Sequence, residues 1–259
     1  MKVTTQVLSS THNPLIKDVR RAASRGVRTE QGYAVCEGSH LFDEAVASGA
    51  DIGAVLISEE EEQTGERDWP AGAAVYQLPR TLFREIATTE SPQGIVTLVR
   101  LREAGVDSIL TSREPLLLLD GIQDPGNAGA IVRAAEAFGG GGVMFLKSTV
   151  SPYNPKCLRA AAGSLFRIPF VNHPDGEAVR EAIAARPVEL YAAMPNAKVS
   201  IESVDWTKPS AIVIGSEGRG VSAEWSAVAT PIGIPTTGVE SLNAAVAAAV
   251  ILYEARRGR

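Results

Sequence analysis

The sequence has few cysteines and histidines. Among its 259 residues there are two cysteines, Cys36 and Cys157, and three histidines. The cysteines form no C-x-x-C pair and the histidines are scattered, so the sequence supports neither a disulfide framework nor a zinc ribbon. We therefore expect no metal site, and a reducing, cytoplasmic compartment is the simplest interpretation of the sparse cysteines.

Long apolar runs are also missing. The longest, at residues 244–253, is about half of the roughly 20 residues that span a bilayer, which predicts a buried helix and no membrane association. The first six residues lack the apolar core that a signal peptide needs, so we expect none there. The hydrophobic content of 45% is ordinary for a soluble globular protein and excludes a disordered or fibrous chain.

Positive charge is in the minority. The chain has 25 Lys and Arg residues against 30 Asp and Glu, a formal net charge of −5. An excess of acids argues against a nucleic-acid partner, because neutralising phosphates is the main source of affinity. The charge is uneven, however: residues 1–28 hold six basic residues and one acid, whereas residues 59–68 hold six acids and one arginine. The acidic stretch is typical of a solvated loop, and the basic stretch leaves RNA binding open.

The basic residues belong to a predicted helix. Asn13 can cap this helix and Pro14 suits its first position. Apolar residues then recur on one face, and basic residues lie on another. The basic side chains on or just after the helix are Lys17, Arg20, Arg21, Arg25 and Arg28. Such a face is either simply solvated or a docking surface for phosphates.

The rest of the first 100 residues alternates predicted strands and helices. The strands are expected at 33–37, 52–58, 74–78 and 94–99, and the helices at 39–48 and 81–87. This pattern predicts a small α/β domain over residues 1–100. Residues 101–113 are polar and irregular and form the best candidate for a linker.

Residues 114–259 carry a second α/β pattern of the doubly wound kind. Strands are expected at 116–120, 143–146, 189–193 and 211–214, and helices at 128–138, 155–163, 176–185 and 241–256. Ligands of such sheets bind beyond the carboxyl ends of the strands, so the loops that follow strands are the candidate site.

The loop after the first of these strands leads into a helix. On that helix Ile131, Ala135 and Phe138 face the core, which leaves Arg133 about 200° away from Ile131. Arg133 is therefore either an ordinary surface residue or a group that points at a ligand or partner. Asn127, just before the predicted helix, could simply be its N-cap.

Two further loops follow strands. The glycines of 215–220 have the order G-x-x-G-x-G, not the dinucleotide-binding G-x-G-x-x-G, and Glu217 among them would repel a phosphate. These glycines either let the backbone approach a flat ligand or form a plain turn. The loop 234–243 leads into an Ala-rich helix, for which Ser241 is a plausible N-cap. Small residues on that helix allow another backbone to pack close to it.

Taken together, these segments resemble a known family. The matching residues are Asn127-Ala128-Gly129-Ala130-Ile131-Val132-Arg133, Gly215-Ser216-Glu217-Gly218-Arg219-Gly220, and Ile234-Pro235 with Ser241-Leu242-Asn243. They resemble the three motifs of the SpoU/TrmH family of SPOUT-class RNA 2'-O-ribose methyltransferases. The N-terminal segments Ser10-Thr11-His12-Asn13-Pro14-Leu15-Ile16-Lys17, Glu37-Gly38 and Pro92-Gln93-Gly94 are similar to the substrate-binding domain of that family, a ribosomal-protein-like α/β fold. The resemblance covers almost the whole chain.

The resemblance implies a C-terminal SPOUT α/β domain tied in a deep trefoil knot, against the general rule that chains do not thread loops. It also implies S-adenosylmethionine as cofactor and a homodimer whose active site is completed across the interface. The implied cofactor contacts are Met194, Gly215, Glu217, Ile234, Ser241, Leu242 and Asn243. Two departures, Thr236 where the family often has Met and Ser216 where some relatives have Asn, bear on subfamily more than on activity.

The same resemblance implies roles in catalysis and RNA binding. Arg133 would lie at the ribose 2'-hydroxyl, and because a guanidinium stays protonated we favour stabilisation of the developing alkoxide over proton removal. The residues implied to assist it are Asn127, Glu217, Ser241 and Asn243. The implied RNA contacts are Asn13, Lys17, Arg20, Arg21, Arg25, Arg28 and Arg159.

Several alternatives remain at this stage. The chain could be a ribosome-associated RNA-binding protein that keeps the fold without the chemistry. A nucleotide-binding oxidoreductase or a conventional Rossmann methyltransferase is disfavoured by the missing G-x-G-x-x-G. Within the family, tRNA is the alternative substrate. We favour large-subunit ribosomal RNA, by analogy, because the N-terminal domain resembles one that recognises folded rRNA.

Overall fold

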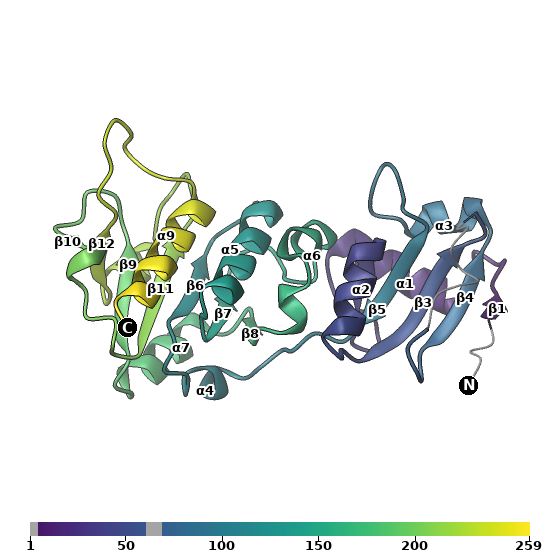
Figure 1. Cartoon of the computed structure of the whole chain (residues 1–259), viewed down its shortest axis with the longest axis horizontal. Coiled ribbons are helices and arrows are strands. Elements are labelled where there is room, and N and C mark those ends of the chain that lie inside the picture. The colour runs from purple at the N-terminus through teal and green to yellow at the C-terminus, as the bar shows by residue number, and fades with distance from the viewer. Residues whose placement is uncertain (1–4, 61–68) are drawn as a thin grey trace. The chain divides into compact units, whose positions relative to one another are not determined.

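The computed structural model describes residues 5–60 and 69–259, which fall into two units (Figure 1). The first unit comprises the residues up to Leu101 together with Tyr153–Phe166, and the second comprises Arg102–Pro152 and Arg167–Arg259. Residues 61–68, most of the acidic stretch, lie outside the described part. Within the described part, no helix has the length and apolar character needed to cross a membrane.

The first unit is built on a mixed sheet. Its described residues form five strands in the order β1-β4-β3-β5-β2, and β5 runs antiparallel to both of its neighbours. The strands are β1 (Thr5–Val7), β2 (Ala34–Glu37), β3 (Ile52–Ser58), β4 (Ala74–Leu78) and β5 (Ile95–Val99). The helices are α1 (Pro14–Arg25), α2 (Ser39–Ala47), α3 (Arg80–Ile86) and α6 (Pro155–Ala161), and a 3-10 helix follows at Ser164–Phe166.

Helix α1 begins and ends where its local chemistry requires. The side chain of Asn13 accepts a hydrogen bond from the N–H of Leu15 at 2.9 Å, and Pro14 occupies the first turn. Gly26, with φ of 62°, ends the helix in the left-handed conformation that glycine adopts without strain. The helix packs its apolar face, Ile16, Val19 and Ala22, into the core of the first unit.

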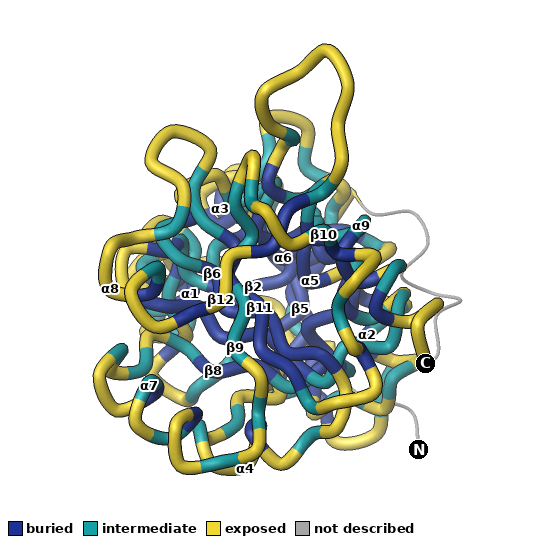
Figure 2. Tube along the Cα trace, turned by 90° about the vertical axis from the view of Figure 1, so that its left-hand side faces the viewer, coloured by how far each residue is buried: buried dark blue, intermediate teal, exposed yellow. Residues whose placement is uncertain are grey.

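The second unit is built on a parallel sheet. Its strands follow the order β10-β12-β9-β11-β6-β7-β8 in the described residues. The strands are β6 (Leu116–Asp120), β7 (Gly142–Phe145), β8 (Phe170–Asn172), β9 (Glu189–Ala193), β10 (Val199–Ser200), β11 (Ser210–Gly215) and β12 (Thr230–Gly233). The helices are α4 (Val106–Ile109), α5 (Pro125–Ala137), α7 (Gly176–Ala184), α8 (Ala223–Ser226) and α9 (Ala244–Arg257), with a 3-10 helix at Ile201–Ser203. Figure 2 shows buried residues along β11, and exposed residues in the long loops.

Strands β6 and β11 lie side by side in the middle of this sheet, although they are far apart in the sequence. Asp120 at the end of β6 is paired with Gly215 at the end of β11. From β6 the chain builds outward through β7 and β8, and it then crosses to the other side of β11 to form β9. Such a reversal of strand order opens a crevice at the carboxyl ends, where open α/β sheets bind their ligands.

The segment expected to be an irregular linker is partly structured. Residues Val106–Ile109 form α4, and Ile109 and Leu110 are buried in the core of the second unit. The apolar residues Val106, Ile109 and Leu110 have the spacing of a helical face, which explains the short helix. The expectation of an irregular 101–113 is therefore wrong over these residues.

Candidate active site

The three motif segments of the second unit converge on one group of side chains. The amide nitrogen Nδ2 of Asn127 donates a hydrogen bond to Oε1 of Glu217 at 2.9 Å. The amide of Asn243 donates both to Oδ1 of Asn127, at 3.1 Å, and to the same Glu217 oxygen. We call these three residues the amide–carboxylate junction. It joins the start of α5, the loop after β11 and the start of α9.

Helix caps hold two members of the junction in place. Asp124, not Asn127, is the N-cap of α5, because its carboxylate accepts a hydrogen bond from the N–H of Asn127 at 2.8 Å. Asn243, not Ser241, is the N-cap of α9, and its Oδ1 accepts from the N–H groups of Ala245 and Val246. Both cap predictions made from the sequence are therefore wrong. The side-chain amide of Asn243 thus caps α9 through its oxygen and joins the junction through its nitrogen.

A cavity of about 480 Å³ lies on one side of the junction. It is bounded by the loops after β9, β11 and β12 and by the start of α9, and we call it the β12-side cavity. The residues predicted for cofactor binding that line it are Met194, Gly215, Glu217, Ile234, Ser241 and Leu242. Asn243 does not line the cavity but is hydrogen-bonded to Glu217, which does. The structure thus brings this predicted set together.

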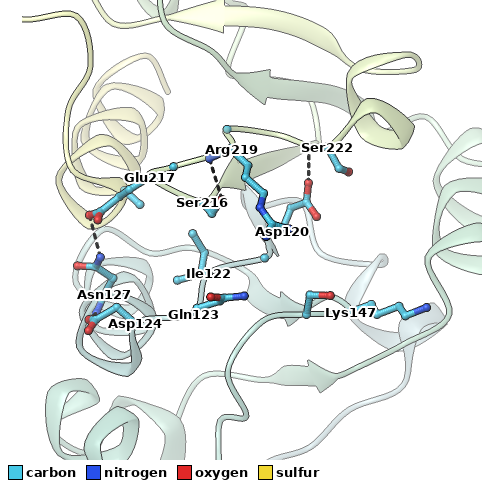
Figure 3. A pocket seen from close by; sticks show the side chains of 15 residues that line it. Asp120, Ile122, Gln123, Asp124, Asn127, Lys147, Ser216, Glu217, Arg219 and Ser222 are labelled. Atoms are coloured by element: carbon cyan, nitrogen blue, oxygen red, sulfur yellow. Dashed lines mark hydrogen bonds between the residues drawn. The ribbon is translucent and has the colours of Figure 1, made fainter.

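A second cavity of about 420 Å³ lies on the other side of the junction (Figure 3). It is bounded by the loops after β6, β7 and β11, and we call it the β6-side cavity. Its wall includes Asp120, Gln123, Lys147 and Arg219. The two cavities share Ser216, Glu217, Gly220 and Ala244 as a common wall. The site is therefore two neighbouring compartments at the carboxyl ends of the strands.

The glycines after β11 are required by close backbone packing. A Cβ atom on Gly215 would lie 2.1 Å from the carbonyl carbon of Gly220, so no larger residue fits there. The turn is closed by a hydrogen bond from the N–H of Gly220 to the carbonyl of Ser216 at 2.8 Å. Asp120 fixes its far end, because its Oδ2 accepts from the N–H of Ser222 at 2.7 Å. The loop forms a partition between the cavities, held by these hydrogen bonds.

Arg133 is placed apart from both cavities. It is exposed on α5, and it lines neither the β12-side nor the β6-side cavity. Within the described residues its side chain forms no hydrogen bond or ion pair. The exposure agrees with the orientation expected from the helical spacing. Within one chain, then, Arg133 is not assembled with the amide–carboxylate junction.

The predicted RNA contacts of the first unit fall into two groups. Some have partners: Arg20 pairs with Glu85 at 2.8 Å, Arg21 pairs with Asp18, and Arg28 lies over the ring of Tyr153. Asn13 is the cap of α1. Lys17 and Arg25 are exposed and have no ion pair among the described residues.

Arg159 has a defined place within the first unit. It is on α6, and its Nη1 donates to Oγ1 of Thr88 at 2.7 Å. That hydroxyl and the N–H of Thr88 both donate to the buried carboxylate of Glu37, which also accepts from the hydroxyl of Thr89. Arg159 therefore ties α6 to the Glu37 network.

Neither cysteine is suited to nucleophilic chemistry. Both thiols are free and buried, and burial raises the pKa of Cys157 to about 12 and that of Cys36 further still. A thiolate is the reactive form, so these side chains are inert in the folded protein. Within the described residues, no group of His, Cys, Asp and Glu side chains is arranged to hold a metal ion.

Sequence reasoning missed parts of both cavities. The turn Pro195–Lys198 after β9 lines the β12-side cavity, and Lys147 after β7 lines the β6-side cavity. A Pro-Asn pair directly after a predicted strand is a turn signal that could have marked the first of these. Nothing local marks Lys147, because its place depends on the pairing of β7 with β6.

The chain is similar to known RNA methyltransferases. Residues 114–253 match the SpoU rRNA Methylase family, and residues 13–97 match the MRM3-like substrate binding domain. The 23S rRNA (guanosine(2553)-2'-O)-methyltransferase RlmP of Bacillus subtilis is 32% identical and aligns over 96% of this chain and 98% of its own.

Two solved structures are similar over nearly the full length. The AdoMet-bound rRNA methyltransferase from Sinorhizobium meliloti has a TM-score of 0.83 and 28% identity, with 98% of each chain covered. The SpoU methyltransferase AviRb from Streptomyces viridochromogenes, in complex with the cofactor AdoMet, has a TM-score of 0.80 and 28% identity, with 95% of this chain and 98% of that one covered.

These matches place the chain among RNA-modifying enzymes of the methyl-transfer class. The chain belongs to the SpoU family of S-adenosylmethionine-dependent RNA 2'-O-ribose methyltransferases, and it carries an N-terminal substrate-binding domain. The family predicted from the three motifs is thereby confirmed. The trefoil knot expected in the second unit is inferred from this membership.

Proposed function

We propose that this protein transfers a methyl group from S-adenosylmethionine to the 2'-oxygen of a ribose in large-subunit ribosomal RNA. The observation that carries the proposal is the amide–carboxylate junction, in which all three motifs meet at Glu217, a residue of the wall that the two cavities share. Ribosomal RNA is favoured over tRNA because the relative from Bacillus subtilis is a 23S rRNA enzyme that aligns with almost the whole chain.

The β12-side cavity suits S-adenosylmethionine in size, surface and charge. Its volume of about 480 Å³ lies in the range of small-molecule sites. Its charged lining residues are Lys198, Glu217 and Glu240, a net charge of −1. The cofactor carries a sulfonium, an ammonium and a carboxylate. Its net charge is therefore +1, opposite in sign to the net charge of the cavity lining. Apolar side chains of Met194, Ile234 and Leu242 would pack against its uncharged parts.

The bound cofactor would supply a methyl group that is already activated on sulfur. The task left to the protein is to align the ribose oxygen with that methyl and to stabilise the charge that develops as the hydroxyl proton leaves to solvent. We assign the stabilisation of the developing charge to Arg133, whose guanidinium stays protonated. Asn127, Glu217 and Asn243 would hold the motif loops in register, and Ser241 would hydrogen-bond near the donor or the nucleotide.

Because Arg133 lies outside both cavities of its own chain, we propose that it serves the site of a second copy in a homodimer. The surface near it supports this arrangement. On α9, Val246 and Tyr253 are 49% and 56% exposed, and Tyr253 packs edge-on against Phe138 at the end of α5. Exposed apolar side chains on α9, the helix that packs against the α5 of Arg133, are of the kind that a twofold dimer buries. A Val246→Asp variant should sediment as a monomer and lose methyl transfer.

The first unit would dock the RNA. Lys17 and Arg25 are the side chains of the α1 region with charge available for phosphates, and Arg20, Arg21, Arg28 and Arg159 would add to the same surface where RNA displaces or extends their present contacts. Asn13 would contribute chiefly by capping α1.

Incubation of the purified protein with methyl-labelled S-adenosylmethionine and with bulk rRNA or bulk tRNA tests the proposal. The expected result is label in 2'-O-methylated nucleosides of large-subunit rRNA, lost in the Arg133→Ala variant. Label in tRNA alone would make tRNA the substrate. RNA binding without any label would favour a non-catalytic RNA-binding protein of the same fold.

A further inference from the structure

The β6-side cavity has an ordered distribution of charge. Its carboxylates sit at the walls and are held by the fold: Asp120 accepts from Ser222, Asp124 accepts from Asn127, and Glu217 belongs to the amide–carboxylate junction. Its cations, Lys147 and Arg219, are exposed. Within the described residues, neither side chain forms a hydrogen bond or an ion pair. The carboxylates thus hold the loops of the fold together, and the two cations are available to bind an anion.

The loops that carry the two cations place them at the mouth of the cavity. Figure 3 shows Arg219 reaching from the loop after β11 into the space beside Asp120, and Lys147 extending outward from the loop after β7. Asp120 is half-buried between them, with one of its two oxygens engaged by the N–H of Ser222. Gln123, on the loop after β6, adds an amide that can donate and accept hydrogen bonds.

This arrangement of carboxylates and cations is complementary to a single nucleotide. The base and ribose are uncharged and rich in N–H and O–H donors, which suit carboxylate and amide acceptors at a cavity wall. The phosphate is anionic and suits cations at the mouth. A free phosphate inside the cavity would face three carboxylates and be repelled. The shared wall with the β12-side cavity would bring the ribose of such a nucleotide beside the methyl donor.

We propose that the β6-side cavity binds one nucleotide of the RNA substrate, with its phosphate held by Lys147 and Arg219 and its base or ribose hydrogen-bonded to Asp120 and Gln123. This assignment rests on the proposed function. Lys147 and Arg219 are binding residues for the RNA and have no part in holding S-adenosylmethionine.

The test uses the full-length protein and the variants Lys147→Ala, Arg219→Ala and their combination. Each single variant should raise the KM for rRNA about tenfold and the double variant about a hundredfold, with kcat changed less than threefold. The slope of log affinity against log salt should fall by about 1 for each cation removed. Binding of S-adenosylmethionine, measured by calorimetry, should stay within twofold of wild type.

Lys208→Ala provides a charge-matched control. Lys208 is exposed and precedes β11, at the end of the strand remote from the cavities, where it pairs with Glu189 at 3.4 Å. The Lys208→Ala variant should have the same KM for rRNA and the same salt slope as the wild type. Unchanged KM and salt slope in the double variant would overturn the inference while leaving the proposed function intact. A wild-type protein that does not methylate rRNA would instead remove the proposed function itself.

Discussion

Most of the predicted RNA-contacting cations of the first unit differ from Arg133, Lys147 and Arg219 of the second unit in how much of their charge is used inside the fold. On the first unit, the basic side chains with partners are Arg20, Arg21, Arg28 and Arg159. On the second, Arg133, Lys147 and Arg219 are exposed and have no side-chain hydrogen bond or ion pair in the described part of the chain.

The difference separates charges that stabilise the fold from charges that are available for RNA. An exposed ion pair contributes about 0–1 kcal/mol, so partnered arginines can still rearrange, but they must give up a contact to bind phosphate. Composition and helical spacing treat all of these side chains alike. The structure ranks them by how much of their charge the fold already uses.

The largest effect is expected at Arg133. Replacement with Ala should lower the rate of methyl transfer about a thousandfold, because one preorganised charge aimed at a developing alkoxide contributes about that much. Binding of S-adenosylmethionine should stay within twofold. Single-turnover kinetics measures the first quantity and calorimetry the second. An Arg133→Lys variant should recover little, since its ammonium lacks the planar geometry of the guanidinium. Near wild-type turnover in Arg133→Ala would remove this residue from the mechanism.

The next effect is expected at the junction. Glu217→Ala removes the acceptor that two amide groups share, and should lower methyl transfer about a hundredfold and weaken S-adenosylmethionine binding. Glu217→Gln keeps one acceptor oxygen and should lose less. Glu224→Ala, which removes an exposed carboxylate paired with Arg180, is the control and should behave as wild type. Equal activity in the Glu217 and Glu224 variants would mean that the junction does not organise the site.

A smaller effect separates the two groups of cations on α1. The double variant Lys17→Ala/Arg25→Ala should weaken rRNA binding about tenfold and lower its salt slope by about 2. The double variant Arg20→Ala/Arg21→Ala removes the same charge but also two ion pairs, and should weaken binding less than threefold while costing up to about 2 kcal/mol of stability. Filter binding at several salt concentrations gives both slopes. Identical losses of rRNA affinity in the two double variants would mean that partnered and unpartnered cations of α1 contribute equally to RNA binding.

The smallest effect concerns α6, which the sequence places amid the second unit and the structure groups with the first. Cys157 on α6 and Cys36 on β2 are both buried, so at pH 8 a thiol reagent should label neither in the native protein. In native-state labelling under mild denaturant, both should become reactive with the same opening free energy. Earlier exposure of Cys157 alone would show that α6 is not part of the first unit's cooperative core.

The same thiols predict that stability depends on pH above the ordinary thiol pKa. Because burial raises the pKa of Cys157 to about 12, the unfolded chain loses this proton first as the pH rises past about 9. The unfolded state then binds fewer protons than the native state, so stability falls with further increase in pH. Below the ordinary thiol pKa the contribution is fully present.

Much of the fold could be predicted because several of its strands are marked by patterns of residues that are close in the sequence. The strands Ile52–Ser58, Ala74–Leu78 and Glu189–Ala193 are apolar runs between turn residues, and the structure gives each the predicted bounds. Strand β12 was missed. Pro231 lies within it, and proline lacks the N–H that an interior strand normally uses.

The site could be predicted as a set of motifs but not as a geometry. The family motifs indicate Asn127, Glu217 and Asn243, but the sequence has no signal that the two amides donate to one oxygen of Glu217. The motifs do not indicate Lys147, because its place depends on β7 pairing with β6. The choice of Asn243 over Ser241 as a cap is a competition between near neighbours that packing decides.

The central claim, ribose methylation of large-subunit rRNA, is tested most directly by mapping 2'-O-methyl sites in rRNA and tRNA from cells with and without the gene. The account predicts that one ribose of the large-subunit rRNA loses its methyl group without the gene. The wild-type gene should restore that methyl group, and the Arg133→Ala gene should not. An unchanged rRNA methylation pattern, or a change confined to tRNA, would contradict it.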